Sequence, residues 1–568
     1  MHQVAMGPGA PDEPGRPLNG GDTPPTKELD MKLRNGSDQQ HQFSQVPHAN
    51  IARSTFSRSH GFKTTFNSAL LVPFYVDEVL PGDTYAVNAT LFARLSTPFV
   101  PVMDNIYLDT FYFFVPHRLV WTHFANFMGE ENAPGDYVNN VVSYLTPVVT
   151  TPAGGHTALS LADYFGIPTS INGMQNVIAF PFRAYNLIWN EWFRDENVSF
   201  KLPVNTGDGP DAATDYNLVQ RMKRHDYFTS CLPWPQKGPG VSIPLGAQAT
   251  VKTNATDLLT GVQPNMRLLT AAAGATPTAQ RAVGTGAVGN NFGESATAIT
   301  PGAGLYPSNL YADLSTATAA TINSLRQAFQ IQRLYERDAR GGSRYTELVR
   351  SHFGVTSPDA RLQRPEYLGG STQRVNISPV TQTSASNTQP TPLASLAGIG
   401  TSAGQTGFTK SFTEHGTIIG LMSVRADMTY QQGLNKMWSR RTRFDFYWPV
   451  LANLGEQPVL NQEIYAQGTA ADLQAFGYQE RWAEYRYYPS LITGQFRSQH
   501  PLPLDVWHLA QKFTALPTLN TAFMVEAPPI SRILAVPSQP QFLLDSYIDV
   551  RATRPMPVYS VPGMIDHF

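Results

Sequence analysis

Apolar and polar positions alternate strictly in the stretch from Thr84 to Phe92. One set of alternate positions is largely apolar and consists of Tyr85, Val87, Ala89 and Leu91, and the other consists of Thr84, Ala86, Asn88 and Thr90. A period of two is typical of a half-buried β-strand. Residues 106–115 are apolar at nearly every position and rich in aromatics, which predicts a strand covered on both faces.

The far end of the chain shows the same alternation. Within 541–552, one face would carry Phe542, Leu544, Ser546, Ile548 and Val550, and the other Leu543, Asp545, Tyr547, Asp549 and Arg551. Between residues 62 and 120, Pro-Gly, Thr-Pro and Asp-Asn breakers separate further strand-like runs. Short strands divided by turn signals predict an all-β sandwich or barrel. We expect residues 62–120 to form the first half of its core and the far end to form the other half.

Helical spacing occurs between these strand-rich ends. Ser160 and Asp163 have the spacing of a capping box ahead of a short helix. Residues 180–197 carry an aromatic stripe at helical spacing, made of Phe182, Tyr185, Trp189, Trp192 and Phe193. Such a stripe indicates a core or subunit interface rather than a cofactor site. Helical spacing returns over 321–340 and in a second short helix that ends at Gly354. The predicted fold class is therefore all-β with α insertions.

Three segments have a composition that does not favour a packed core. Residues 1–50 are rich in Gly, Pro, Asp and Gln, which predicts an N-terminal arm that is disordered or ordered only by a partner. Residues 245–320 are dominated by Ala, Thr, Gly and Asn, which predicts a low-complexity insertion that projects from the body. Residues 381–407 are expected to form an exposed loop. The remainder, 51–568, is interpreted as a single domain, although 568 residues would allow two to four domains.

Composition indicates that neighbouring molecules cover part of the surface. Charged residues make up only 15% of the chain, below the roughly 25% of average soluble proteins, while aromatics reach 11% and there are 45 prolines. A chain of this kind is expected to bury much of its surface against other subunits. A large soluble β-rich enzyme with long loops is the alternative that composition leaves open.

Net charge, cysteine content and the lack of long apolar runs limit where the protein is expected to fold and which ligands it is expected to bind. The net charge of −2 provides no global field for nucleic acid, so any such contact must be local. The single cysteine, Cys231, excludes an internal disulfide and a cysteine-cluster metal site. The N-terminal sequence lacks the apolar region of a secretory signal, and no run approaches the roughly 18 apolar residues of a membrane span. We expect a soluble protein, folded in a reducing cytoplasm, without membrane insertion, cofactor or metal.

Two groups of residues are candidates for binding. Cations interleaved with aromatics suit the phosphates and bases of single-stranded nucleic acid, and the candidates here are Arg53, Arg58, Lys63, Phe56 and Phe62. An ordinary solvated arm explains these residues equally well. Tryptophans and arginines elsewhere favour packing between subunits, and the candidates are Trp189, Trp192, Trp234, Trp438, Arg440, Arg441 and Trp482. A further basic cluster consists of Arg221, Lys223, Arg224 and His225.

Two short motifs that are typical of enzymes occur in the sequence, but the residues around them do not have the structure that each motif requires. Residues 284–289 match the dinucleotide fingerprint, but their flanks read neither as a strand nor as a helix. Residues 400–404 match the nucleophile-elbow pattern without the buried strand before it or the helix after it. The 13 histidines include no HExxH motif. The sequence predicts no active site.

Several long blocks identify a family. The blocks are SRSHGFKTTFNSALLVPFYVDEVLPGDTY, RLSTPFVPVMDNIYLDTFYFFVPHRLVW, KRHDYFTSCLPWPQKGP, ERDARGGSRYTELVRSHFGV, RLQRPEYLGG, FTEHGTIIGLMSVRADMTYQQGL, YQERWAEYRYYPSLITGQFRS and VPGMIDHF. From about residue 50 to its end, the chain resembles the major capsid protein of the Microviridae, specifically of the gokushovirus branch, which are small single-stranded DNA bacteriophages. The low-complexity stretches and the N-terminal tail do not take part in the resemblance.

The resemblance implies an eight-stranded antiparallel jelly roll with long interstrand loops, assembled into a T=1 icosahedral capsid around circular single-stranded DNA. It implies that a variable insertion forms protrusions at the threefold axes and contacts a bacterial host receptor, for which 245–320 is the candidate. A small basic DNA-binding protein, an internal scaffolding protein and a pilot protein are the implied partners, and the virion, assembled in the host cytoplasm, is the implied location. The rival from another class is a β-sandwich carbohydrate-binding or hydrolytic protein with decorated loops.

Overall fold

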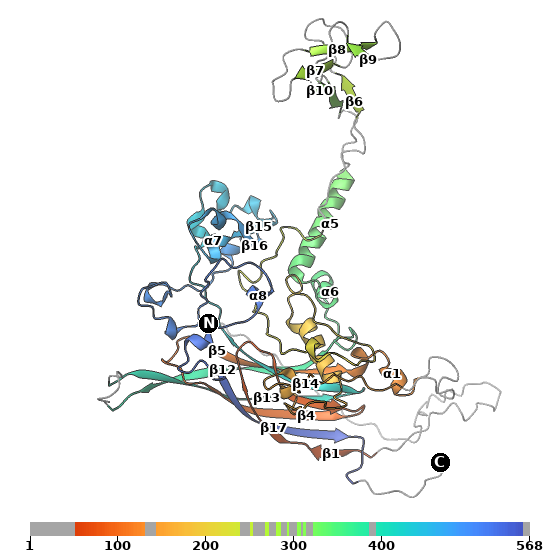
Figure 1. Ribbon diagram of the computed structural model, residues 1–568, viewed down its shortest axis with the longest axis vertical. Coiled ribbons are helices and arrows are strands. Elements are labelled where there is room, and N and C mark those ends of the chain that lie inside the picture. Colours follow the sequence, from red (N-terminus) through yellow and green to blue (C-terminus); the bar gives the residue numbers. More distant parts are fainter. Residues whose placement is uncertain are drawn as a thin grey trace, which may run out of the picture. The chain divides into compact units, whose positions relative to one another are not determined.

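The computed structural model (Figure 1) describes residues 52–130, 144–238, 322–384 and 393–559, together with short strands between 250 and 313. The predicted N-terminal arm, 1–50, lies outside the described residues. No described helix combines the length and the apolar character that crossing a membrane would require.

Nine strands form the central β-structure, and eight of them have the pairing of a jelly roll. These eight are β2 (His60–Phe66), β3 (Val72–Val79), β4 (Thr84–Leu95), β5 (Ile106–Pro116), β12 (Glu366–Thr381), β13 (Leu396–Ser411), β14 (Gly416–Ala426) and β17 (Phe542–Arg554). In chain order the first pairs with the last, the second with the seventh, the third with the sixth and the fourth with the fifth, all antiparallel. This nested pairing is that of a hairpin rolled into a double sheet. The predicted closure of the fold by the C-terminal strand is confirmed.

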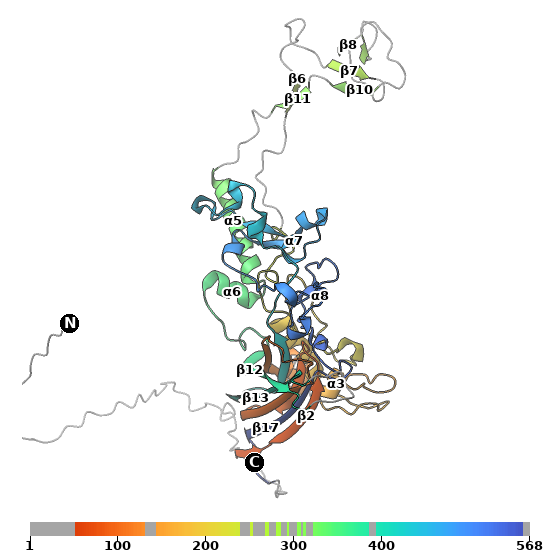
Figure 2. The same ribbon diagram turned by 90° about the vertical axis from the view of Figure 1, so that its left-hand side faces the viewer.

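The rolled hairpin gives two sheets that share one strand. The first sheet has the order β2-β17-β4-β13, and β1 (Ser54–Ser57) extends its edge by pairing with the end of β17. The second has the order β3-β14-β5-β12. Strand β12 joins them, because residues 366–375 pair with β5 and residues 376–381 pair with β13. Figure 2 shows β12, β13, β17 and β2 in this order across the curled arrangement, in which β4 lies between β13 and β17.

Alternation in the sequence determines which face of each strand points into the barrel. Along β4, buried and exposed positions alternate, with Tyr85, Val87, Ala89 and Leu91 buried as predicted. Along β17, the predicted buried set from Phe542 to Val550 is also confirmed. Each fully buried large apolar side chain stabilises the fold by about 1.5–3 kcal/mol. These two strands pair with each other, so their apolar faces form a continuous wall of the core.

Strand β5 is buried on both faces because two insertions cover the second sheet. One insertion, between β5 and β12, contains α1 (Phe124–Phe127), α3 (Leu161–Tyr164), α4 (Phe180–Ile188), α5 (Ile322–Gly341) and α6 (Tyr345–Phe353). The other, between β14 and β17, contains β15 (Glu456–Leu460), α7 (Asn461–Ile464), β16 (Ala475–Glu480) and α8 (Thr521–Met524). Phe113 and Val115 on β5 pack into a core with Trp121 and Tyr185 of the first insertion. The same strand turns Tyr112 and Phe114 into the barrel.

Local signals for two of the helices are confirmed. The Ser160 side chain accepts a hydrogen bond from the backbone N–H of Asp163 at the start of α3. Helix α6 ends at Gly354, whose φ of +70° is left-handed and favours glycine. The aromatic stripe of 180–197 begins in α4 and continues through a π-helical turn, Trp189–Phe193.

The structure bears differently on the two segments, 245–320 and 381–407, that were expected at the surface. Within 245–320, six short strands are described, and they pair only with one another: β7, β8, β9 and β10 in one sheet, β6 and β11 in another. The prediction that this insertion projects from the body stays a prediction. For 381–407 the predicted loop is wrong over residues 396–407, which lie in β13 between β4 and β12. Gly, Ser and Thr are typical of loops, but β13 is a central strand in which small residues allow the neighbouring backbone to approach closely. At Gly407, for example, a Cβ atom would lie 2.1 Å from the carbonyl oxygen of Val87.

Candidate functional site

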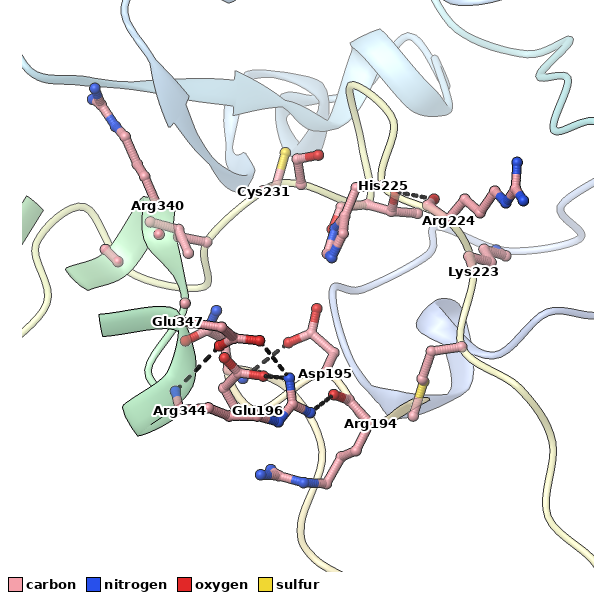
Figure 3. A pocket seen from close by; sticks show the side chains of 18 of the residues that line it. Arg194, Asp195, Glu196, Lys223, Arg224, His225, Cys231, Arg340, Arg344 and Glu347 are labelled. Carbon is pink, nitrogen blue, oxygen red and sulfur yellow. Dashed lines mark hydrogen bonds and ion pairs between the residues drawn. The ribbon is translucent and has the colours of Figure 1, made fainter. Parts of the chain in front are cut away.

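A cavity of about 820 Å³ lies where the outer face of β5 meets both insertions (Figure 3). Its aromatic wall is formed by Phe111, Phe113, Trp192, Phe193 and Tyr367. These rings pack on one another, for example with 5.4 Å between the ring centroids of Phe113 and Trp192. The rest of the wall is polar and charged, so the chemistry of the cavity depends on how its charges are paired.

Ion pairs neutralise one side of the cavity. Arg344 contacts Glu196 at 3.0 Å and Glu347 at 2.9 Å, as Figure 3 shows. Burial and the neighbouring Glu196 carboxyl raise the pKa of Glu347. Arg340 similarly contacts Glu456 at 2.6 Å. These guanidinium groups are engaged by carboxylates of the same chain and are not free to bind an anion.

The basic cluster predicted from the sequence lies on the opposite side and is also largely engaged. Arg221 and Arg425 both donate to the Oδ2 atom of Asp109 on β5, at 2.5 and 2.8 Å. Burial opposes ionisation of Asp109, but the hydrogen bond and charge of Arg221 outweigh it and lower its pKa. Lys223 is buried over the ring of Phe523 at 4.2 Å, and burial lowers its pKa to about 8.

The cavity contains no arrangement of a nucleophile and a base among its described residues. Burial, followed by the charge of Glu463, raises the pKa of the Cys231 thiol well above its usual value, so it is not an activated nucleophile. No group of three or more His, Cys, Asp or Glu residues in the described part of the chain is placed to hold a metal ion. The cavity is thus a junction between β5 and the two insertions that is stabilised by ion pairs.

The motif at 400–404 lies inside the extended strand β13, where residues 401–404 pair with β4. A nucleophile elbow requires a sharp turn between a strand and a helix, which this segment does not make. The dinucleotide-like motif at 284–289 begins in β8 (Gln280–Thr285), and its remaining residues lie outside the described residues.

Of the five predicted DNA-contact residues, two are exposed cations, Lys63 and Arg53. Lys63 is opposite Asp545 in the pairing of β2 with β17, and its side chain is 78% exposed. Arg53 precedes β1 and donates to the carbonyl oxygen of Gly82. Both cations remain accessible, and their contact with DNA stays a prediction.

The other three residues have partners within the chain, and their contact with DNA also stays a prediction. Arg58 forms a 2.6 Å ion pair with Asp77. Phe62 packs against the barrel core, and Phe56 lies opposite the buried Ala552 and so points to the inner side. The sequence did not reveal this because residue types alone do not show which side of a strand faces the core.

The residues predicted to pack between subunits differ in how far their own chain buries them. Trp189 and Trp482 are buried by their own chain, which corrects the prediction for them. Trp192 is half-buried and donates to the carbonyl oxygen of Pro365 at 3.0 Å. Trp234 is partly exposed. Trp438 is 70% exposed, and packing against another subunit stays a prediction for it.

The segments 437–451 and 485–491 expose many large side chains, which are together called the aromatic surface here. Its exposed large side chains are Trp438, Phe444, Phe446, Tyr447, Trp448, Val450, Tyr485, Tyr487, Tyr488 and Leu491. Arg440 connects its two segments, with its guanidinium 4.2 Å from the ring centroid of Tyr485 and 5.5 Å from that of Phe446. Arg441 is exposed beside it. Soluble monomers rarely expose apolar patches of this kind without a binding partner.

Comparison with known proteins decides the family. The family model described as "Capsid protein (F protein)" matches residues 44–564. The chain belongs to this capsid protein family.

Three curated relatives agree, each named "Capsid protein VP1". The chain is 48% identical to that of Bdellovibrio phage phiMH2K over 544 residues, covering 95% of this chain and 100% of the relative. It is 44% identical to that of Chlamydia phage 1, covering 92% and 98%, and 38% identical to that of Spiroplasma virus 4, covering 92% and 97%. The predicted relationship to gokushoviruses of the Microviridae is confirmed.

The capsid protein is thus a structural subunit of a phage virion that assembles into a multimeric shell. This role agrees with the jelly-roll fold and with an exposed aromatic surface. The density of aromatics and arginines in the sequence indicates part of the aromatic surface, but residue types alone do not separate the exposed side chains from the buried ones.

Proposed function

We propose that this capsid protein builds a T=1 icosahedral shell around circular single-stranded DNA, and that it has no catalytic activity. The observation that carries the proposal is the aromatic surface, where Trp438 is 70% and Val450 is 94% exposed. Aromatic and arginine side chains are enriched at the energetically dominant positions of interfaces, where a neighbour removes them from water. A second copy of the chain is the partner that a closed shell supplies.

The remaining roles belong to other parts of the assembly. The insertion 245–320 would form a protrusion at the threefold axes and contact a bacterial host receptor. A small basic DNA-binding protein would supply the phosphate neutralisation that a chain with a net charge of −2 lacks. An internal scaffolding protein and a pilot protein would act with it during assembly in the host cytoplasm.

Substitution at Trp438 tests the proposed contact. Co-expression with the assembly partners, sedimentation and negative-stain microscopy would measure shell yield. We expect Trp438→Ser to lower the yield at least tenfold, because loss of a buried aromatic anchor costs about 2 kcal/mol or more at each contact. Trp438→Tyr is the matched control and should retain most assembly. Circular dichroism should show both variants folded.

Two results would contradict the proposal. Unchanged assembly of Trp438→Ser would exclude this surface as a shell contact. A wild-type chain that stays monomeric with its partners and binds glycans would favour the β-sandwich carbohydrate-binding alternative. Deletion of 245–320 tests the attachment role separately: shells should form but fail to adsorb to host cells, and loss of folding would count against a peripheral insertion.

A further inference from the structure

Proline recurs at a regular spacing in the N-terminal part of the sequence. The period is three residues, and the prolines are Pro8, Pro11, Pro14 and Pro17. A polyproline II helix has three residues per turn, so in that conformation the four proline rings would share one face of the segment. Residues 7–18 include only one large apolar side chain, so the segment has no core of its own to bury its prolines. Its proline face therefore requires a partner surface.

Segments of this kind bind to surfaces that are lined with aromatic side chains. Flat aromatic rings pack on the proline rings, and the entropic cost is low because the segment is already stiff before it binds. The backbone carbonyl groups of a polyproline II helix make no internal hydrogen bonds, so they accept hydrogen bonds from the partner. A suitable partner surface thus combines several exposed rings with hydrogen-bond donors that have no other acceptor.

The aromatic surface offers both features. Tyr447 and Tyr485 bring its two segments together, with 6.3 Å between their ring centroids. Trp438 and Tyr488 are among its most exposed rings, and Tyr488 is 68% exposed. The indole N–H of Trp438 and the hydroxyl of Tyr488 have no hydrogen-bond partner in the part of the chain that the structure describes. These rings are therefore available to a proline-rich segment.

Charge complementarity favours the same pairing. The two segments of the aromatic surface contain four arginines and one acidic residue. Two of these arginines, Arg441 and Arg443, are exposed and form no ion pair with any described residue. The proline-rich segment carries Asp12 and Glu13 between its second and third prolines, against the single cation of Arg16. Its acidic residues are thus opposite in charge to the unpaired arginines.

A second copy of the chain is within reach as the source of the segment. Residues 18–52, 35 in number, separate Pro17 from Arg53, which precedes β1. Fully extended, they span at most about 120 Å. A compact chain of about 500 residues has a radius of gyration of only about 23 Å. The tether is therefore long enough to leave its own subunit and reach a neighbour.

We propose that residues 8–17 of one copy bind, as a polyproline II helix, to the aromatic surface of a neighbouring copy. The proline rings pack on the exposed rings around Trp438, and Asp12 and Glu13 lie near Arg441 and Arg443. The inference rests on the proposed function, in which a second copy covers the aromatic surface. It names the part of that copy which makes the contact.

Fluorescence anisotropy of a labelled synthetic peptide of residues 6–19 tests the contact directly. The receptor is a full-length chain in which the four prolines are replaced, so that its own segment does not compete. This receptor, here called the arm variant, carries Pro8→Ser, Pro11→Ser, Pro14→Ser and Pro17→Ser. Adding Trp438→Ser to it should weaken peptide binding about tenfold or more, because a buried aromatic anchor contributes at least that much. Trp438→Tyr is the matched control and should retain most of the binding.

A rearranged peptide tests the spacing. It has the same composition as residues 6–19 but unevenly spaced prolines, which cannot share one face of a polyproline II helix. We expect it to bind about tenfold more weakly than the natural peptide. Equal binding of the two peptides, or no saturable binding of the natural one, would overturn the proposal.

Salt dependence tests the charged contact. Arg441→Ser with Arg443→Ser should weaken peptide binding about two- to fivefold and flatten its dependence on salt, because exposed ion pairs are weak and screened. Arg333→Ser with Arg337→Ser is the matched control, since it removes two exposed arginines from α5 and should leave binding unchanged. Salt dependence that the first pair of substitutions does not alter would contradict the proposed placement of Asp12 and Glu13.

Mixing two variants shows whether the contact is made between copies. The arm variant keeps the aromatic surface, and the Trp438→Ser chain keeps the proline-rich segment. Neither chain should associate with itself through this contact, but the mixture should form a complex in sedimentation velocity. A mixture that forms no complex would overturn a contact between copies, and the segment would then bind its own chain.

Shell assembly separates this inference from the proposed function. In co-expression with the assembly partners, the arm variant should lower shell yield about tenfold or more, as expected for loss of an interface anchor. The control is Pro24→Ser with Pro25→Ser, which removes two prolines outside the regular spacing and should assemble normally. Normal shells from the arm variant would refute the inference alone, whereas a wild-type chain that forms no shells would refute the proposed function.

Discussion

Arg183 and Asp211 form a doubly hydrogen-bonded ion pair in which both side chains are completely buried. The Arg183 Nε and Nη2 atoms donate to the two carboxylate oxygens at 2.7 and 2.8 Å, and Nη1 donates to the carbonyl oxygen of Val120 at 2.9 Å. Asp211 also accepts hydrogen bonds from Tyr216 and Asn205. The pair thereby joins α4 to two irregular segments of the insertion that covers β5.

Removing one member of this pair should be costly. Arg183→Met would leave a buried carboxylate without its partner, and we expect a loss of about 3–5 kcal/mol in the free energy of unfolding. Urea denaturation monitored by circular dichroism would measure it. The exposed Arg551→Met is the matched control and should change stability by no more than about 0.5 kcal/mol. A small effect at Arg183 would show that the insertion tolerates loss of the pair.

The same pair predicts sensitivity to acid. Burial would raise the pKa of Asp211, but hydrogen bonds from Arg183 and Tyr216 and the charge of Arg183 lower it overall. A carboxyl with a depressed pKa stabilises the folded state above its unfolded pKa of about 3.9, and this stability is lost as pH falls toward the folded value. Melting temperatures from pH 6 to pH 2.5 should fall less steeply in Asp211→Asn, although that variant starts from lower stability. Parallel curves would contradict this assignment.

His117 should make stability depend on pH nearer neutrality. Its ring is buried 4.4 Å from that of Phe180, and burial, followed by the charge of His415, lowers its pKa to about 4. Below about pH 6.5 the unfolded chain therefore binds a proton at this histidine, whereas the folded chain does not. The free energy of unfolding consequently falls by up to about 3 kcal/mol between pH 6.5 and pH 4. Urea midpoints at pH 7 and pH 5 should converge in His117→Gln. The exposed His500→Gln should keep the wild-type difference.

Gly407 should not tolerate a side chain. A Cβ there would lie 2.1 Å from the carbonyl oxygen of Val87 on the paired strand β4. Gly407→Ala must separate two central strands, and we expect a loss of about 1–3 kcal/mol. Gly61→Ala on the same sheet is the matched control, because its Cβ would make an ordinary 3.7 Å contact with the Ser546 carbonyl oxygen. Thermal melting of both variants would measure the difference.

The thiol of Cys231 should be inert in the folded chain. It is buried, and its raised pKa leaves little thiolate at neutral pH. Ellman's reagent should modify it at least 100-fold more slowly in buffer than in denaturant. Rapid labelling of the folded chain would show that the segment around Cys231 opens readily.

The sequence predicted the elements that have a clear period. Alternation in β4 and β17 identified both strands and their buried faces, because a period of two reports directly which side is apolar. The Ser160 cap and the Gly354 stop are equally local, since each depends on a few neighbouring residues. By contrast, the composition of 381–407 predicts a loop, whereas residues 396–407 lie in β13. Its small polar residues lack a hydrophobic period, and only its pairing with β4 and β12 makes it a strand.

Sequence alone therefore determined the strand-rich ends, the low charge, the absence of a composed catalytic motif and the resemblance to a capsid protein. The tertiary structure decided which residues are available for binding. It buried Trp482, packed Phe62 partly against the core, and left Trp438, Phe92 and Tyr547 exposed. It also paired Arg58 and Arg221 with carboxylates. The physical reason is that exposure and ion pairing arise from residues hundreds of positions apart, as in the pairing of β2 with β17, which no local pattern records.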